Sequence, residues 1–207
     1  MPRRSASAVD ADRARTLREA VDLASVVGLE GLTIGSLAER LQMSKSGLAG
    51  RFGSKEQLQL AALDLAAEMF ANVVYDPAAS APAGRRRLLA ICDRWIAFLG
   101  EPCFRGGCFL TTASVEFDAR PGPVRDAVRA TMRRWLRVLE DEAATAVRQG
   151  ELPAGTDPAA LAFTINALAV GTNCDFQLHR DASALARGRS AMEALLAPGP
   201  APLAAAA

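Results

Sequence analysis

The sequence predicts an all-α protein of about nine helices. Apolar residues recur at spacings of three and four along most of the 207 residues, alanine is abundant, and the alternation that marks strands is weak throughout. Hydrophobic residues make up 50% of the chain and charged residues 23%, which is ordinary for a globular protein and argues against global disorder. The length allows one large domain, or a small domain joined to a larger one.

An N-terminal arm, residues 1–9, is expected before the first helix. Asp10 can cap that helix, which runs to about Val27 with an apolar face. Gly28 then supplies the left-handed residue that ends many helices. The beginning of the chain therefore predicts one helix with a face to bury against the elements that follow.

Two short helices in series form the next predicted element. Thr33 caps the first, which extends to Leu41, and Ser44 caps the second, which ends near Phe52. Two short helices joined by a tight turn above a supporting helix are typical of a helix-turn-helix, whose second helix enters the major groove of DNA. The alternative is a plain helical hairpin with a solvated basic face. On the first reading, residues 1–54 form a DNA-binding domain.

A connecting helix over residues 55–75 and a larger helical region over residues 76–197 follow. Ser54 to Gln57 match the capping box that opens such a helix, and the Pro- and Ala-rich stretch from Asp76 to Gly84 predicts a loop. The remaining helices are expected at 85–99, 108–117, 124–148, 158–178, capped by Asp157, and 182–196, with a disordered tail at 198–207.

Charge on the whole chain gives no argument for nucleic acid, because the net charge is +1. A basic surface must therefore be local. Lys45, Arg51 and Lys55 are three cations within eleven positions that contain no carboxylate, so the second short helix and its flank carry local positive charge. Hydroxyls and free amides at the leading end of that helix can contact phosphates and base edges.

The four cysteines and one histidine leave little for metal binding or catalysis. No CxxC pair occurs, so no metal site and no cofactor are expected. A nucleophile would have to use His179 as its base, and no nucleophile motif is present, so no catalytic residue is assigned and a helical enzyme is the remote alternative. Cys103 and Cys108 could form a redox sensor, although cysteine is more often a small buried apolar residue.

The expected location is the cytoplasm. Arg3 and Arg4 are followed by no apolar segment, so no secretory leader is expected. The apolar stretch 159–174 is too short, and too interrupted by polar residues, for a membrane span. No membrane partner is therefore expected, and the thiols should be reduced.

The stretch over residues 31–58 resembles the DNA-binding domain of the tetracycline-repressor (TetR) family. The segments that carry the resemblance are Gly-Leu-Thr, Leu-Ala-Glu-Arg, Ser-Lys-Ser-Gly-Leu and Phe-Gly-Ser-Lys-Glu-Gln-Leu, in the right order and spacing. The resemblance covers about residues 16–70. Residues 107–109, 116–118 and 120–126 also resemble a TetR-type regulatory domain.

This resemblance implies a homodimer that binds a near-palindromic operator in double-stranded DNA and, most often, a repressor that a small-molecule effector releases. A ligand-independent DNA-binding dimer is the second reading. By resemblance, Thr33 and Lys55 touch phosphate, while Ala49 stands where the family commonly has an aromatic residue and Arg51 where histidine is frequent. The expected DNA-binding residues are Thr33, Ser44, Lys45, Ser46, Gly47, Arg51 and Lys55.

The helix predicted at 158–178 carries no charge from Ala159 to Cys174 and is apolar nearly all round. Such a helix must be buried on more than one face. It is either the central core helix of a monomer or, with the helix at 182–196, part of a two-fold interface, which the resemblance favours. The residues expected at this dimer interface are Leu161, Ile165, Leu168, Thr172 and Phe176.

Aromatic residues and a few isolated polar residues in the second half predict a small-molecule pocket between the helices of 85–117 and 124–169. Small-molecule sites are built as mostly apolar cavities with a few convergent polar groups. For any one of these aromatics taken alone, core packing is the more common role. A neutral or weakly polar organic ligand would move the connecting helix and change the separation of the two recognition helices. The expected ligand-binding residues are Trp95, Phe98, Phe109, Thr112, Phe117, Trp135 and Asn166.

Overall fold

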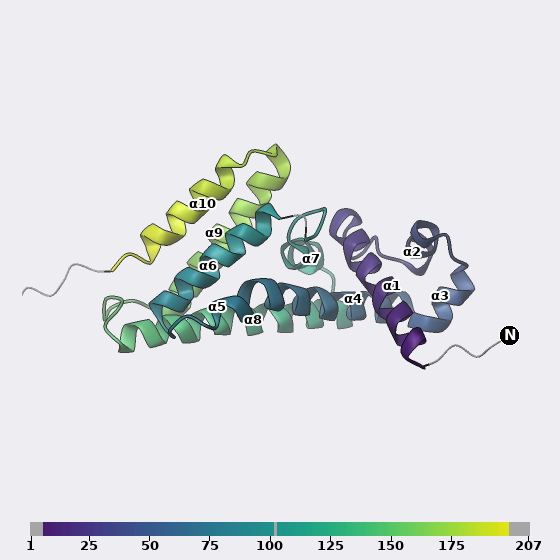
Figure 1. Ribbon diagram of the computed structural model, residues 1–207, viewed down its shortest axis with the longest axis horizontal. Coiled ribbons are helices and arrows are strands. Elements are labelled where there is room, and N and C mark those ends of the chain that lie inside the picture. The colour runs from purple at the N-terminus through teal and green to yellow at the C-terminus, as the bar shows by residue number, and fades with distance from the viewer. Residues whose placement is uncertain (1–5, 102, 199–207) are drawn as a thin grey trace, which may run out of the picture. The chain divides into compact units, whose positions relative to one another are not determined.

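The computed structural model describes residues 6–101 and 103–198, and within these ranges every regular element is a helix (Figure 1). An unbroken run from α4 through the π-helical turn η1 to α5 counts as one helix, which gives the nine that the sequence predicts within the described residues. The first five residues of the expected arm and residues 199–207 of the expected tail lie outside the described ranges. The elements are α1 Ala6–Val27, α2 Ile34–Leu41, α3 Lys45–Phe52, α4 Lys55–Phe70, η1 Ala71–Tyr75, α5 Asp76–Ala78, α6 Arg85–Gly100, α7 Phe109–Phe117, α8 Pro123–Arg148, α9 Pro158–His179 and α10 Ser183–Leu195.

Most helix ends lie where local chemistry predicts them. Thr33 caps α2 with its side chain, Ser44 caps α3, and Asp157 caps α9 through the N–H groups of the residues at its first turn. Asp10 is an exception, because α1 already begins at Ala6. No glycine or proline stands between Ala6 and Asp10, and alanine favours helix, so nothing forces the helix to start at the aspartate.

The connecting helix extends further than the sequence predicts. The sequence predicts a loop from Asp76, but the helix continues as η1 and then as α5. Pro77 lies in the first turn of α5. Proline lacks an N–H and cannot extend an ordinary α-helical ladder, whereas a π turn changes the hydrogen-bond spacing just before it. The irregular segment is therefore shorter than expected and begins after Ala78.

Two compact units make up the fold, and they do not follow the predicted domains in order along the chain. The first unit combines the described residues of Met1–Phe70 with those of Pro102–Met132. In it α1 packs on α2 and α4, and α7 packs on α1 and α4. Burial of each large core side chain here contributes roughly 1.5–3 kcal/mol relative to exposure. The fully buried set is Leu29, Leu32, Leu37, Leu48, Leu58, Leu63 and Phe109.

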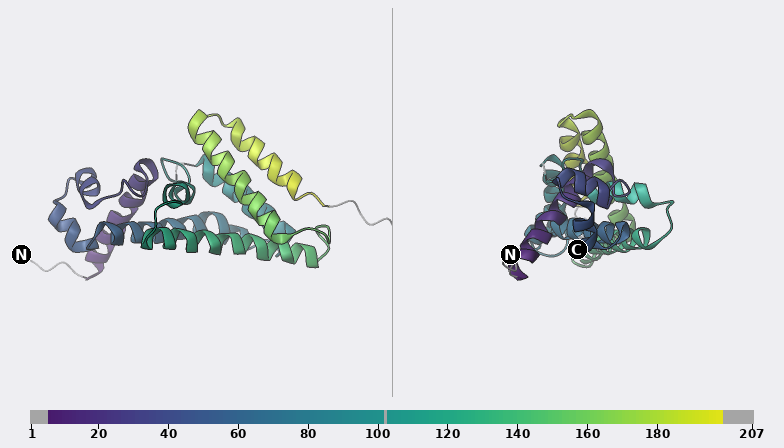
Figure 2. Two further views of the ribbon diagram at one scale, coloured as in Figure 1. Left: turned by 180° about the vertical axis from the view of Figure 1, so that it is seen from behind. Right: turned by 90° about the vertical axis from the view of Figure 1, so that its right-hand side faces the viewer.

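The second unit comprises Ala71–Glu101 and the described part of Arg133–Ala207. Here α9 and α10 lie side by side and α6 packs against both, as the views of Figure 2 show. Buried Glu142 accepts a hydrogen bond from the Gly84 N–H at 2.7 Å and pairs with Arg87 at 2.9 Å, which fixes the start of α6. The fully buried large side chains are Leu88, Ile91, Leu139, Ile165 and Met192.

One helix in the described part of the chain, Lys55–Ala78, is long and apolar enough to cross a membrane by length and composition alone. The core helix of a globular protein passes the same test. In this chain α4 packs on α1 with Leu58, Ala62 and Ala66 buried.

Candidate nucleic-acid interface

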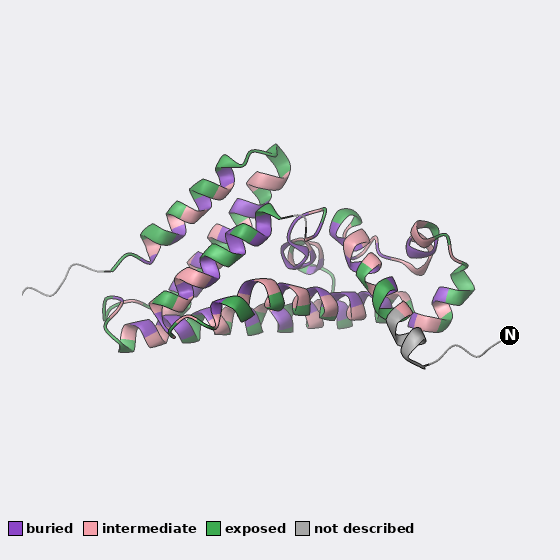
Figure 3. Ribbon diagram, in the orientation of Figure 1, coloured by how far each residue is buried: buried purple, intermediate pink, exposed green. Residues whose placement is uncertain are grey.

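The first turn of helix α3 is exposed to solvent, and two buried apolar side chains anchor the helix to the core. Leu48 and Phe52 are buried, whereas all four residues from Ser44 to Gly47 are exposed (Figure 3). The Ser44 hydroxyl accepts a hydrogen bond from the Gly47 N–H at 3.2 Å, so the cap is formed within the turn itself. The four residues expected to contact DNA at this end therefore lie together on the surface, on a helix whose position the core fixes.

Helix α2 is placed beside α3 by a cap at one end and a tight turn at the other. The Thr33 hydroxyl accepts from the Ser36 N–H at 2.9 Å, and the Ser36 hydroxyl accepts from the Thr33 N–H at 2.9 Å, a reciprocal capping box. Gln42 adopts a left-handed conformation with φ of 53°, and the Met43 N–H donates to the Ala38 carbonyl at 2.9 Å. This turn sets the helix-turn-helix geometry that the sequence predicts.

Lys45 is the cation at the leading end of α3. It is exposed, and within the described ranges no carboxylate lies at ion-pair distance from it. Its side chain lies beside Gly35 of α2: a Cβ atom added to this glycine would be 3.6 Å from Lys45 Nζ. The Lys45 ammonium group is therefore available to an anion without first breaking an ion pair.

Arg51 and Lys55, in contrast, are both held by carboxylates from elsewhere in the chain. Arg51 Nη1 lies 2.6 Å from Asp12 Oδ2 of α1, and Lys55 Nζ lies 2.5 Å from Glu30 Oε1 of the connector between α1 and α2. The hydrogen bond from Arg51 lowers the pKa of Asp12, and that from Lys55 lowers the pKa of Glu30. Residues 45–55 themselves contain no carboxylate, but Asp12 and Glu30 from other segments offset the charge of two of the three cations.

Arg13 of α1 is a cation beside α3 that the sequence pattern did not single out. Its guanidinium lies 5.4 Å from the centroid of the Phe52 ring, and its side chain is exposed. Nothing local to Arg13 signals this position, because its contact with Phe52 forms only when the chain folds. The positive charge near α3 thus comes from Lys45 and from an arginine of α1.

Comparison with known proteins bears directly on this arrangement. A model of the tetracyclin repressor-like C-terminal domain matches residues 84–192, more than half of the chain, and a model of bacterial regulatory proteins of the tetR family matches residues 17–62. The chain belongs to the TetR family of transcriptional regulators. Among curated protein sequences no match was found.

Solved structures agree with this assignment. A TetR transcriptional regulator from Chloroflexus aurantiacus J-10-FL is 26% identical with a TM-score of 0.77, covering 88% of this chain and 92% of its own. A TetR-family regulator from Cytophaga hutchinsonii is 21% identical with a TM-score of 0.80, covering 93% and 96%. AibR, solved with isovaleryl coenzyme A and operator DNA, is 21% identical with a TM-score of 0.75, covering 90% and 99%. The last two support the fold alone.

The predicted ligand-binding residues of this TetR-family chain are divided between the two units. Phe109 and Phe117 are buried in the first unit, where Thr112 Oγ1 donates to the Cys108 carbonyl at 3.4 Å. In the second unit Trp95, Phe98 and Trp135 are buried.

Within the second unit, the Trp95 and Trp135 rings meet edge to face with centroids 5.1 Å apart. Asn166 Oδ1 in the same unit is buried and accepts no hydrogen bond from the described residues. A buried amide oxygen without a donor is costly in a closed core, and a bound hydrogen-bond donor would satisfy it.

Cys103 and Cys108, which the sequence allowed as a redox sensor, differ in their burial. Cys108 is buried, and burial raises the pKa of its thiol. Burial likewise raises the pKa of Cys92 to about 12. Cys103 is half-buried. A thiol that stays protonated is a poor nucleophile, so Cys108 is better described as a small buried side chain.

The predicted dimer residues of α9 are divided between its two sides. Leu161 and Ile165, which the sequence predicts at the interface, are buried within the second unit of the single chain. A helix that is apolar all round gives no sign of which side faces its own core. Phe176 is half-buried. The large apolar side chains of α9 that do reach solvent are Phe163, 69% exposed, and Leu178, 78% exposed.

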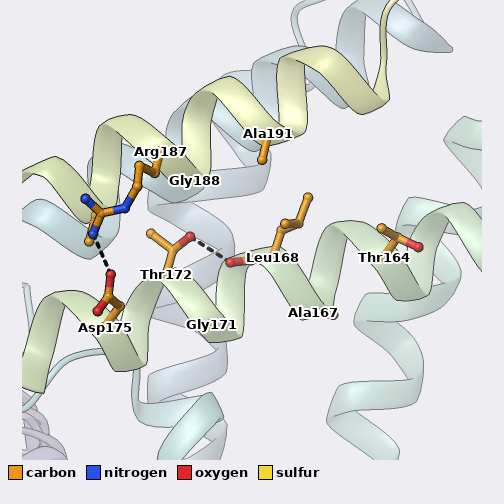
Figure 4. A pocket seen from close by; sticks show the side chains of 10 residues that line it. Thr164, Ala167, Leu168, Gly171, Thr172, Asp175, Arg187, Gly188 and Ala191 are labelled. Carbon is orange, nitrogen blue, oxygen red and sulfur yellow. Dashed lines mark hydrogen bonds and ion pairs between the residues drawn. The ribbon is translucent and has the colours of Figure 1, made fainter.

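A shallow groove of about 420 Å³ runs between α9 and α10 on the surface of the second unit (Figure 4). Small residues form much of its floor, and Arg187 and Asp175 form an ion pair at 2.7 Å across one end. Leu168 and Thr172, both predicted at the dimer interface, line the groove. The other lining residues are Thr164, Ala167, Gly171, Ala184, Gly188 and Ala191.

Proposed function

We propose that this TetR-family regulator is a one-component repressor: a homodimer that binds a near-palindromic operator through α3 and leaves it when a small, largely apolar effector binds. The observation that carries the DNA-binding part is the exposed first turn of α3 above its buried anchors, Leu48 and Phe52. A regulator of this kind acts in the cytoplasm.

In this proposal the first turn of α3 lies in the major groove. Ser44, Ser46 and the backbone of Gly47 face base edges, and Lys45 neutralises a phosphate. Thr33 lies at the start of α2, where helix N–H groups favour phosphate oxygens. Arg51 and Lys55 contribute less than their charge suggests, because each is already paired with a carboxylate.

The dimer would use the exposed side of α9 together with the groove between α9 and α10. Phe163 and Leu178 are large apolar side chains that the single chain leaves in solvent. Small exposed groove residues such as Ala167 and Gly171 allow another helix to approach closely. Two copies packed on this face would form a two-fold interface in which the same surface meets itself. Each of the two copies of α3 would then bind one half-site of the operator.

The effector would meet aromatic side chains and the Asn166 amide. Trp95, Phe98 and Trp135 supply a rigid apolar surface, and Asn166 Oδ1 supplies an acceptor for a hydrogen-bond donor on the ligand. The structure of AibR with both isovaleryl coenzyme A and operator DNA supports a regulator of this fold that takes both kinds of ligand.

The salt dependence of DNA affinity tests the proposed DNA contacts. A duplex selected by the protein from a random pool is titrated at several salt concentrations with the wild type and with Lys45→Ala. Log affinity falls as log salt rises, and losing one phosphate contact should make this slope less steep by about one per protomer. Lys55→Ala, whose ammonium already pairs with Glu30, should change the slope less, and Arg137→Ala, exposed on α8, should leave it unchanged. Equal slopes for Lys45→Ala and the wild type would contradict the proposed contact.

A further inference from the structure

Glu116 of α7 holds the connector that joins α1 to α2. Its Oε2 accepts a hydrogen bond from the Leu29 N–H at 2.7 Å, and its Oε1 accepts one from the Glu30 N–H at 3.2 Å. A carboxylate that accepts from two backbone amides makes stronger hydrogen bonds than a neutral acceptor does. Glu116 lies within the C-terminal family domain, at 84–192, whereas both amides lie within the N-terminal family domain, at 17–62.

The connector fits closely around this carboxylate. Gly28 has φ of +81°, and a Cβ placed on it would lie 2.5 Å from Glu116 Oε1. Glycine is therefore needed at this position both for the left-handed backbone and for the space that the carboxylate fills. The sequence predicts the first requirement, but only the structure shows the second.

Helix α4 contacts the same part of the connector, residues 28–30. Buried Gln59 donates from Nε2 to the Leu29 carbonyl at 2.7 Å, and Lys55 pairs with Glu30. The connector leads directly into the cap of α2, where the Leu32 N–H donates to the Leu29 carbonyl at 3.2 Å. A shift of the connector would therefore change the start of α2, which packs on α3.

The loop before α7 makes a second and independent link to the same helices. Arg105 pairs with Asp22 of α1 at 2.6 Å, and Asp22 also accepts from Arg40 of α2 at 2.5 Å. The Gly106 N–H donates to the Ser25 hydroxyl at 3.2 Å. The loop before α7 and the last turn of α7 are thus bonded to α1 and to the connector, respectively, within the first unit.

We infer that Glu116 is a positioning residue for operator binding. Its carboxylate fixes residues 28–30 of the connector. The positions of α2 and α3 therefore depend on the position of α7, and the reverse. This inference rests on the proposed function and adds to it a second route, besides α4, by which an effector that contacts Phe109 or Thr112 of α7 would change DNA affinity. Because coupling is reciprocal, DNA bound at α3 must also act on α7.

Amide hydrogen exchange measured with and without the selected duplex tests the coupling in the full-length protein. In the wild type, DNA should slow exchange in the peptide that covers residues 109–117 as well as in the connector. In Glu116→Gln, which keeps the side-chain size but loses the charge, the slowing at 109–117 should be lost. Affinity for the duplex should fall between about threefold and tenfold, because one charge-assisted pair of hydrogen bonds is weakened. The salt slope should not change, because Glu116 touches no phosphate.

Asp118→Asn is the matched control, since it removes a carboxylate two residues away whose side chain is exposed. It should bind DNA and show protection as the wild type does. Unchanged affinity and retained protection in Glu116→Gln would overturn the inference. So would a wild-type protein in which DNA leaves exchange at 109–117 unaltered, a result that does not depend on whether the variant folds. A chain that selects no duplex at all would overturn the proposed function, and this inference with it.

Discussion

At the scale of single residues, ion pairs decide which cations of the helix-turn-helix are available to DNA. Asp12 neutralises Arg51 and Glu30 neutralises Lys55, whereas Lys45 stays exposed. Charge along the sequence could not reveal this, because both carboxylates reach α3 and α4 through folding of distant segments. The residue types of the site were predictable, but their electrostatic state was not.

The Asp12–Arg51 pair should make stability depend on pH. The folded pKa of Asp12 is lowered from 3.8, mainly by the hydrogen bond from Arg51, so the pair stabilises the protein above that value. This contribution is lost as pH falls through the lowered folded pKa. Asp12→Asn should therefore be less stable than the wild type at pH 7, and the difference should disappear toward pH 2. Urea unfolding across this range measures it, and a difference that is independent of pH would contradict the ion pair.

Among the helices, α3 contains a glycine, Gly50, that neither its backbone conformation nor its packing requires. Gly50 lies inside the helix, is exposed, and a Cβ placed on it would have no heavy atom within 4 Å. Gly50→Ala should raise the free energy of unfolding by about 0.5–1 kcal/mol, because alanine loses less backbone entropy in a helix. Urea unfolding at fixed protein concentration tests this, with Gly53→Ala as the contrast. Gly53 has φ of +74°, so alanine there should destabilise. Destabilisation by Gly50→Ala would show a constraint on α3 that the structure does not contain.

Helix ends could be predicted from the sequence, whereas helix faces could not always be. Thr33, Ser44 and Asp157 each cap their helix through hydrogen bonds to N–H groups two or three residues ahead, so the signal is local. The buried side of α9 depends on α6 and α10, which no local pattern encodes in a helix that is apolar all round. The sequence could therefore not show that Leu161 and Ile165 are already buried within the single chain.

At the scale of the whole molecule, we expect the exposed face of α9 to hold two copies together. Phe163→Glu places a charge on a side chain that is 69% exposed in the single chain, so it should not unfold the protomer. It should instead weaken the dimer, because the charge would be desolvated at the interface. Sedimentation velocity should show a shift from dimer toward monomer, together with weaker operator binding.

Val115→Glu is the matched control, because Val115 is 66% exposed on α7 and lies outside the proposed interface. That variant should keep the dimer. If Phe163→Glu remains as dimeric as Val115→Glu, the proposed interface is wrong.

Affinity cleavage can show whether the first turn of α3 lies in the major groove. Ser46→Cys, in a chain whose Cys103 and Cys174 are replaced by serine, is coupled to a DNA-cleaving chelate and bound to the selected duplex. If the first turn of α3 lies in the major groove, two clusters of cuts are expected there, one per half-site, about 34–36 Å apart or a multiple of that spacing. The same chelate on Ser190→Cys, an exposed position of α10, should give no such clusters. A Ser46→Cys conjugate that binds the duplex but cuts it no more specifically than the Ser190→Cys conjugate would contradict the claim.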